Sequence, residues 1–284
     1  MATTVDSTVA KVWFITGCSS GFGQEIAIAA LKRGDRVIAT ARKLDALSSL
    51  REIGCDTLAL DVTADDATIE QVAAAAHALY GRIDILVNNA GYSLNGAVEE
   101  ARTQEVFDLF NTNVFGLLKV SRAVLPFLRA QKSGTVANIG SVIGHVPMAA
   151  CGIYGATKAA VASLSQTMRQ ELAPFNIEVV VIEPSLFRTK VMAKSAWSEP
   201  SIDAYVPLID AVKQMIPNQP MGDPVKAAVL IVEALTKTGR AENRPLPNRL
   251  PLGAGTYEPV SVVLKQEEQD LNAWKDFANP ELFA

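Results

Sequence analysis

Short apolar runs alternate along the chain with longer segments in which apolar residues recur every three or four positions. This alternation predicts a mostly parallel sheet covered by helices on both faces, because strands buried on both sides read as unbroken apolar runs. The apolar runs predict strands at 12–15, 37–40, 58–60, 83–87, 135–139 and 177–182. The helical spacing predicts helices at about 21–33, 43–51, 65–79, 103–130, 152–174 and 223–238. The expected fold class is therefore α/β, a doubly wound sheet in one domain over residues 1–284.

The pattern changes after the last of these strands. Residues 185–222 contain prolines and scattered apolar residues without a clear strand, which favours a helical lid over a substrate pocket. The proline-rich segment 244–253 predicts an irregular strand at the edge of the sheet. Residues 254–284 are expected to form a C-terminal extension, with a helix and a tail packed on the outside of the domain.

The composition excludes several classes of protein. With 49% hydrophobic residues and a net charge of −4 over 284 residues, the chain can form a core and offers no basic patch for nucleic acid or an anionic membrane. Three scattered cysteines without a CxxC pair, Cys18, Cys55 and Cys151, exclude a disulfide framework. The two histidines, His77 and His145, cannot form a multi-histidine site, so no metal is expected. No signal peptide or membrane-spanning apolar stretch is expected, which predicts a cytoplasmic location.

A glycine-rich turn, TGCSSGFG over residues 16–23, follows the first strand and precedes a helix. Glycines in such a turn allow the backbone to approach a pyrophosphate at the helix N-terminus. The predicted cofactor contacts of this turn are Gly17, Ser19, Ser20, Gly21, Phe22 and Gly23. Tight strand-to-helix turns also use glycine without a ligand, so the position directly after the first strand is what favours a dinucleotide.

The end of the second strand bears on the choice between NADP(H) and NAD(H). Folds specific for NAD(H) usually place an acidic residue there to bind the ribose 2′-hydroxyl. Here the sequence reads Thr40-Ala41-Arg42, and a guanidinium suits a 2′-phosphate. NADP(H) is therefore the preferred cofactor and NAD(H) the alternative, while a solvated loop charge is the other interpretation of Arg42.

Two further strand ends carry candidate cofactor contacts. Asp61 and Val62 follow the third strand, where Asp61 could bind the adenine amine or simply cap the next helix. Asn89, Ala90 and Gly91 end the fourth strand, at the sheet edge where ligands of such folds bind. A plain turn is the alternative for this second segment.

The sharpest pattern is a serine at the end of the fifth strand, followed by a tyrosine and a lysine four residues apart. Tyr154 and Lys158 lie on one helix face at this spacing, and Ser141 precedes the tyrosine by 13 residues. A free phenol has a pKa near ~10, and an adjacent ammonium is expected to lower it toward the range useful for acid-base catalysis. Such pairs also arise by chance on helix surfaces, so the order after the glycine turn is what favours catalysis.

Together these residues resemble the single-domain branch of the short-chain dehydrogenases/reductases, whose pattern is TGxxxGxG, NNAG, N, S and YxxxK. The resemblance covers residues 11–190 closely and is strongest to steroid- and retinol-dehydrogenase-like oxidoreductases. It implies a Rossmann-like fold in which Tyr154 is the general acid and base. By the same resemblance, Ser141 orients the substrate oxygen, Lys158 holds the nicotinamide ribose, and Asn113 anchors a proton-relay water.

The resemblance extends to the loop after the sixth strand. Pro184 and Thr189 match a PGxxxT pattern that contacts the nicotinamide carboxamide, although Ser185 stands in place of its glycine. Apolar lid residues, Phe187 among them, predict a cavity for a hydrophobic substrate that also touches the serine and tyrosine of the catalytic pattern.

The function expected from these features is NADP(H)-dependent hydride transfer between nicotinamide and the carbonyl or secondary alcohol of a small hydrophobic substrate. Two alternatives stay open: an epimerase or dehydratase that retains its cofactor, and a non-catalytic nucleotide sensor on the same fold. The resemblance also implies a homodimer or homotetramer, and neither nucleic acid nor a membrane is expected as a partner.

Overall fold

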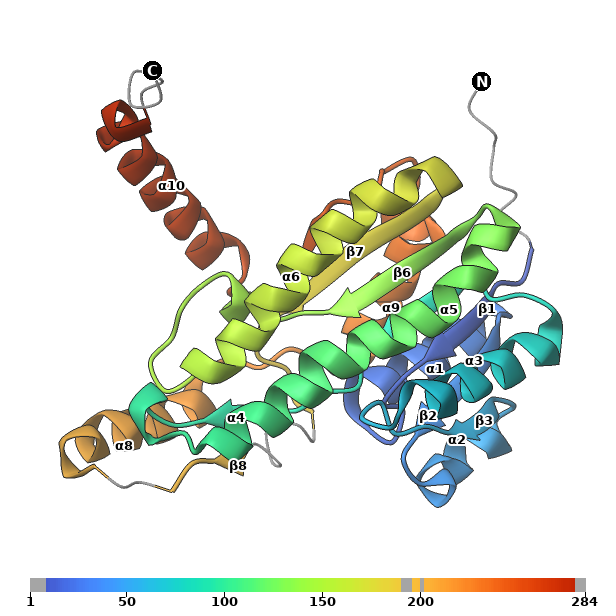
Figure 1. Cartoon of the computed structure of the whole chain (residues 1–284), viewed down its shortest axis with the longest axis horizontal. Coiled ribbons are helices and arrows are strands. Elements are labelled where there is room, and N and C mark those ends of the chain that lie inside the picture. Colours follow the sequence, from blue (N-terminus) through green and yellow to red (C-terminus); the bar gives the residue numbers. More distant parts are fainter. Residues whose placement is uncertain (1–8, 190–195, 200–201, 279–284) are drawn as a thin grey trace.

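A seven-stranded parallel sheet organises the part of the chain that the computed structural model describes, residues 9–189, 196–199 and 202–278 (Figure 1). Its strand order is β3-β2-β1-β4-β6-β7-β9. The strands are β1 (Val12–Ile15), β2 (Arg36–Ala41), β3 (Asp56–Ala59), β4 (Ile85–Asn88), β6 (Gly134–Ile139), β7 (Ile177–Pro184) and β9 (Arg249–Leu252). The chain therefore has the doubly wound, Rossmann-like α/β fold that the alternating pattern predicts, in a single domain.

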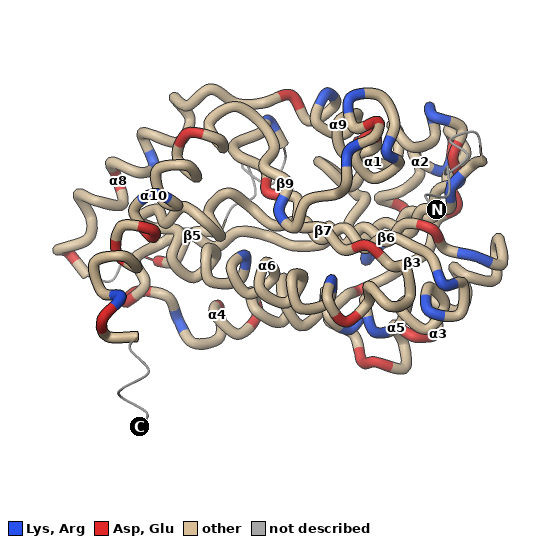
Figure 2. The backbone as a smooth tube through the Cα atoms, turned by 90° about the horizontal axis from the view of Figure 1, so that it is seen from above, with Lys and Arg blue, Asp and Glu red and all other residues tan. Residues whose placement is uncertain are grey.

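Helices cover both faces of this sheet, and charges of both signs are interspersed around it (Figure 2). One face carries α1 (Gly21–Arg33), α2 (Ser48–Glu52) and α9 (Pro224–Thr236), and the other carries α3 (Asp66–Tyr80), α4 (Thr103–Phe110), α5 (Leu117–Gln131) and α6 (Gly152–Leu172). The expected helix over 103–130 is interrupted by a π-helical turn, Asn111–Gly116. The expected helix over 43–51 begins as a 3₁₀ turn, Leu44–Leu47. Among the described residues, no helix is long and apolar enough to cross a bilayer.

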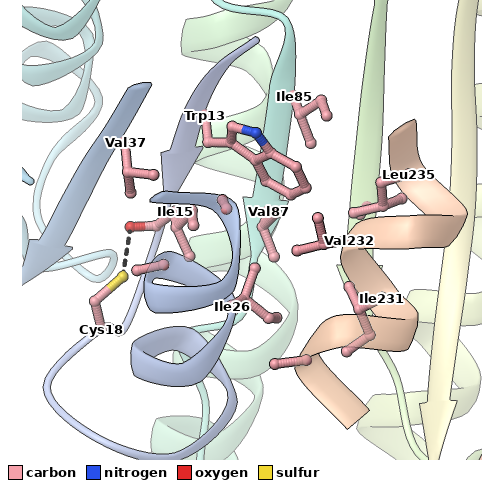
Figure 3. Packing of buried hydrophobic residues seen from close by; sticks show 14 of the residues in the cluster. Trp13, Ile15, Cys18, Ile26, Val37, Ile85, Val87, Ile231, Val232 and Leu235 are labelled. Carbon is pink, nitrogen blue, oxygen red and sulfur yellow. Dashed lines mark hydrogen bonds between the residues drawn. The ribbon is translucent and has the colours of Figure 1, made fainter. Parts of the chain in front are cut away.

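Strand β1 shows why the central strands read as unbroken apolar runs. Trp13 and Ile15 pack into the core shared with α1 and α9 (Figure 3), whereas Val12 and Phe14 belong to the core on the other face. The indole Nε1 of Trp13 donates to the buried Asp35 carboxylate at 2.9 Å. Because successive side chains of a strand point to opposite faces, all four positions of β1 must be apolar.

The lid over residues 185–222 combines helices with a short strand pair. It contains α8 (Val206–Met215) and the two-residue strand β8 (Ala196–Trp197), which pairs with β5 (Leu94–Asn95) in a separate small sheet. The sequence pattern predicts no strand here, because two residues cannot show an alternation. Residues 190–195 and 200–201 of the expected lid lie outside the described residues.

The C-terminal segment departs from the expected packing. The proline-rich stretch does supply the edge strand β9, which pairs with β7. After it, α10 (Tyr257–Ala273) extends away from the sheet (Figure 1), and every residue over 264–278 is exposed. The chain turns away at Gly253 and Gly255, which both adopt positive φ angles, so the helix leaves the domain instead of lying on it.

Candidate active site

A cavity of about 1300 Å³ opens at the carboxyl ends of the parallel strands, which is where ligands bind in sheets of this type. It runs from the loops after β1, β2 and β3 past those after β4 and β6 to the lid. Most predicted site residues line it: Gly17, Ser19, Ser20, Phe22, Arg42, Asp61, Val62, Asn89, Ala90, Gly91, Ser141, Tyr154, Lys158, Pro184, Phe187 and Thr189. Gly21, Gly23 and Asn113 lie behind this lining.

The glycine turn has the backbone that its sequence predicts. Gly17 and Gly21 have φ angles of 72° and 64°, which strain any residue with a side chain. A Cβ at Gly23 would lie 2.4 Å from Nδ2 of Asn89 and 2.6 Å from the Gly17 oxygen. Gly23 is therefore required for close packing of the turn against the neighbouring loop.

A set of hydrogen bonds fastens the loop after β4 to this turn. The Thr16 hydroxyl accepts from the backbone N–H groups of Asn89 and Ala90, at 3.0 and 3.1 Å. The Asn89 amide donates to the carbonyl oxygens of Thr16 and Gly17, at 2.9 and 3.0 Å. The segment is thus more than a plain turn, since it shapes the glycine turn. Thr16 was not predicted as a site residue, because its only signal in the sequence is its place before the first glycine.

The N-terminus of α1 is open toward the cavity. Ser20 is the N-cap residue, yet its side chain makes no capping hydrogen bond, and the first turn of the helix has no acidic residue. Ser19 and Ser20 both line the cavity. Free N–H groups and hydroxyls at a helix N-terminus fit a pyrophosphate. Phe22, in the first turn of α1, packs edge-on against Phe187 of the lid, with ring centroids 5.0 Å apart.

The next two strand ends place one cation and one carboxylate at the same wall. Arg42 is exposed and forms no ion pair with any described residue. Asp61 accepts from the backbone N–H and the hydroxyl of Thr63, at 2.9 and 2.7 Å. The cap of α3 is Asp65, so the helix-capping interpretation of Asp61 is wrong. The Asp61 turn also sets Val62 against the cavity.

The catalytic pattern converges on one wall of the cavity. Tyr154 and Lys158 come from the first turns of α6, and Ser141 follows β6. The Ser141 hydroxyl lies close enough to the Tyr154 phenol to lower the pKa of that phenol. The Lys158 Nζ lies 5.7 Å from the centre of the Tyr154 ring and donates to the Ile139 carbonyl oxygen at 2.8 Å.

Burial dominates the acidity of these groups in the free chain. It raises the pKa of Tyr154 to about 12, against the opposing effect of the Ser141 hydrogen bond, which lowers it. Burial also lowers the pKa of Lys158 to about 8. The expected lowering of the phenol pKa by the ammonium is therefore wrong for the chain without cofactor, where burial has the largest effect and the Lys158 Nζ donates to the Ile139 carbonyl oxygen. At neutral pH the phenol carries its proton.

Asn113 lies in the π-helical turn, a distortion that often marks functional positions. Its Oδ1 accepts from the Tyr92 backbone N–H at 3.1 Å, and its Nδ2 donates to the Tyr92 carbonyl oxygen at 2.9 Å and the Thr157 hydroxyl at 3.2 Å. A Cβ at Gly91 would lie 2.9 Å from the same Oδ1. Asn113 thus joins the loop after β4 to α6, and its relay-water role stays a prediction.

The loop after β7 closes the site on the opposite side. Pro184 ends that strand at the cavity, and Thr189 lies near the glycine turn, 3.5 Å from where a Cβ at Gly21 would be. Ser185, which replaces the expected glycine, donates from Oγ to the Ala254 carbonyl oxygen at 2.8 Å. The substitution therefore ties this loop to the segment that leads into α10.

Comparison with known proteins identifies residues 11–199 as a short chain dehydrogenase. Oxidoreductase BOA17 of Botryotinia fuckeliana is 36% identical over 276 residues, covering 94% of this chain and 98% of that protein. A crystal structure of a short-chain dehydrogenase from Streptomyces avermitilis is 40% identical, with a TM-score of 0.86 over 95% of this chain and 98% of that one. A closed form of serine dehydrogenase complexed with NADP⁺ is 30% identical, with a TM-score of 0.72 over 84% and 93% of the two chains.

None of these three proteins is named as a steroid or retinol dehydrogenase, so that narrower likeness stays a prediction. The glycine turn, the Asn-Asn-Ala-Gly loop and the Ser, Tyr and Lys side chains around one cavity agree with the family match, which spans well over half of the sequence. The chain belongs to the short-chain dehydrogenase family, oxidoreductases that depend on NAD or NADP.

Proposed function

We propose that this chain transfers a hydride between NADP(H) and the carbonyl or secondary alcohol of a small hydrophobic substrate. The observation that carries the proposal is the half-buried Tyr154 side chain beside Ser141 and Lys158, on the wall of a cavity that also reaches the open N-terminus of α1. When bound, the nicotinamide supplies or accepts the hydride.

Three side chains, Tyr154, Ser141 and Lys158, would have separate roles in the reaction. Because burial keeps the Tyr154 phenol protonated at neutral pH, it can donate its proton to the substrate oxygen during reduction. In the reverse direction the Tyr154 phenolate, the form that this step leaves behind, would act as base and take the proton from the substrate hydroxyl. The Ser141 hydroxyl donates a hydrogen bond to the same oxygen and stabilises its developing negative charge. Lys158 holds its Nζ near the Gly91 backbone, where the nicotinamide ribose would be bound.

The cofactor preference rests on the strand ends. The glycine turn with Ser19 and Ser20 would hold the pyrophosphate, and Arg42 would pair with a 2′-phosphate. Asp61 would accept from the adenine amine. The remaining predicted contacts, at Asn89, Ala90, Gly91, Pro184 and Thr189, would hold the nicotinamide half. NAD(H) is the alternative cofactor, and the NADP⁺ in serine dehydrogenase supports the preference.

The substrate half of the cavity favours an apolar molecule. Its described lining includes Val146, Met148, Leu186, Trp197, Met215 and Ile216. Phe187, predicted to bind substrate, lines the cavity but is only 5% exposed and belongs to the core, so little of its surface is open to a substrate. A bulky apolar ketone, as expected for a steroid- or retinol-dehydrogenase-like enzyme, would bury this lining.

We also propose that the enzyme is a homodimer or homotetramer of the cytoplasm. Two large apolar side chains lie exposed along α4 and the π-helical turn that follows it, with Phe107 of α4 57% exposed and Phe115 of the π-helical turn 44% exposed. A second copy would cover them. Light scattering of the wild type and of a Phe107→Glu variant tests this, since a monomeric wild type would contradict it.

The central experiment follows nicotinamide absorbance with a panel of apolar ketones, aldehydes and alcohols. Wild type is expected to consume NADPH with apolar carbonyls, and Tyr154→Phe to lose about 10³-fold in kcat while binding NADPH normally by fluorescence. Tyr80→Phe is the control, because it removes a phenol that contacts Asp56, away from the cavity. Turnover by Tyr154→Phe at the wild-type rate would refute the assignment, and turnover without net NADPH consumption would indicate an epimerase.

A further inference from the structure

A buried ion pair lies directly behind the turn that carries Ser141. Glu183, on β7, is 3% exposed, and its Oε1 accepts from Nε and Nη2 of Arg249, at 2.9 and 2.5 Å. Arg249 begins the edge strand β9, which lies beside β7 (Figure 2). A carboxylate this deeply buried is stable as an anion only with such a partner, so the two side chains hold one another in place.

The ion pair reaches the 3₁₀ turn Val142–Gly144 that follows Ser141. Arg249 Nη2 donates to the Gly144 carbonyl oxygen at 3.4 Å. His145, the next residue, places its Nδ1 3.9 Å from Oε2 of Glu183, and this nitrogen is buried without a hydrogen-bond partner among the described residues. Oε1 of Glu183 therefore binds Arg249, which in turn contacts Gly144 at the end of this turn. Oε2 of Glu183 faces His145, the residue that follows the turn.

The other side of the same turn packs on the catalytic helix. A Cβ at Gly144 would lie 2.8 Å from the backbone carbon and 2.9 Å from the Cβ of Lys158. The Ser141 Oγ in turn accepts from the Ile143 backbone N–H at 3.3 Å. The turn is thus held between α6, which carries Tyr154 and Lys158, and the ion pair of β7 and β9.

We infer that Arg249 and Glu183 are positioning residues that set the Ser141 hydroxyl against the Tyr154 phenol, an inference that rests on the proposed function of that site. Neither side chain is among the described residues that line the cavity, so neither touches the reacting atoms. Their effect passes through the backbone of Gly144 and the short turn back to Ser141. A displacement of about 1 Å at a reacting group costs as much as 10²-fold in rate. Loss of the ion pair that holds this turn is therefore expected to lower the rate.

The test compares Arg249→Lys, Arg249→Met and the double variant Glu183→Gln/Arg249→Met with wild type. The double variant removes both charges together, so it keeps the experiment decisive if the single Met variant leaves Glu183 unpaired and fails to fold. Glu178→Gln is the matched control, because Glu178 lies on the same strand β7 and pairs with Lys237 at 2.7 Å, remote from the Ser141 turn.

We expect the double variant to lose at least about tenfold in kcat for an apolar carbonyl while its NADPH dissociation constant and unfolding midpoint stay near wild type. Arg249→Lys should recover part of kcat, because a lysine can still reach the carboxylate but cannot also hold Gly144. Glu178→Gln should leave kcat unchanged. A crystal structure of the double variant should show the Ser141 Oγ displaced from the Tyr154 hydroxyl.

A folded double variant with wild-type kcat and an unmoved Ser141 turn would overturn the inference. Loss of cofactor affinity or stability equal to the loss of rate would also overturn it, because the pair would then serve the fold as a whole. If wild type reduces no carbonyl of the panel, the proposed function fails, and the crystal structures alone then decide whether the ion pair positions Ser141.

Discussion

Replacing Lys158 by methionine should change the pH dependence of stability as well as abolish activity. The folded chain lowers the pKa of this lysine from 10.5 to about 8 because its ammonium is buried. The unfolded chain thus keeps the proton up to a higher pH than the folded chain does. Between these two pKa values unfolding takes up a proton, so the stability of the wild type rises with pH in that window.

The magnitude follows from the size of the shift. One pKa unit corresponds to about 1.4 kcal/mol, so the charged Lys158 costs the folded state about 3 kcal/mol at pH 7 and about 1 kcal/mol at pH 9.5. Lys158→Met removes this penalty. It also leaves the Ile139 carbonyl oxygen without its donor, a loss of about 1–3 kcal/mol that does not depend on pH. The stability difference, variant minus wild type, should therefore fall by about 2 kcal/mol between pH 7 and 9.5.

Urea unfolding of the cofactor-free proteins at several pH values measures this difference directly. Lys119→Met is the control, because Lys119 also donates to a backbone carbonyl oxygen, that of Ala64 at 2.8 Å, but lies half-buried at the surface. Its stability curve should run parallel to that of the wild type. If the Lys158→Met curve also ran parallel to that of the wild type, burial would not lower the pKa of Lys158 in the folded chain, and the prediction would be wrong.

Three other substitutions test the cofactor site and the core. Gly23→Ala should weaken NADPH binding by at least about tenfold, because the new methyl group displaces Asn89 from the glycine turn; unchanged fluorescence titration would contradict this. Arg42→Asp should shift the ratio of kcat/KM values from NADPH toward NADH by about 10²-fold, and an unaltered ratio would disprove pairing with a 2′-phosphate. Trp13→Phe should lower the free energy of unfolding by about 2 kcal/mol, because the buried Asp35 loses a donor; a loss below about 0.5 kcal/mol in urea titration would show that Arg33 compensates.

The sheet and the site could be predicted because both depend on short sequence patterns, namely apolar runs and the motifs that follow them, which occur in a fixed order along the chain. Strands buried on both faces read as apolar runs, and the helix over 21–33 has the expected bounds, ended by Gly34 in a left-handed conformation. In a parallel sheet all carboxyl ends meet at one edge, so motifs at successive strand ends must converge. This is why the sequence alone predicts that Ser141 and Tyr154 lie together.

The remaining features depend on contacts between distant segments. Glu183 and Arg249 lie 66 positions apart, and each looks like an ordinary strand residue until the two strands pair. The π-helical turn at Asn113 leaves the helical spacing of apolar residues nearly intact, so the pattern there predicts a continuous helix. The raised pKa of Tyr154 is caused mainly by burial, and burial depends on the whole tertiary structure.

The outlying helix α10 implies that the molecule does not melt as one unit. An isolated helix of 17 residues is only marginally stable in water, and α10 is exposed at every residue from Leu264 to its end at Ala273. Its backbone amides should therefore exchange with deuterium far sooner than those of β1 or β4, and a protease should trim it while the sheet stays protected. Because Ala254, Gly255 and Pro259 border the cavity, trimming confined to the exposed residues 264–278 would leave the lining of the cavity intact.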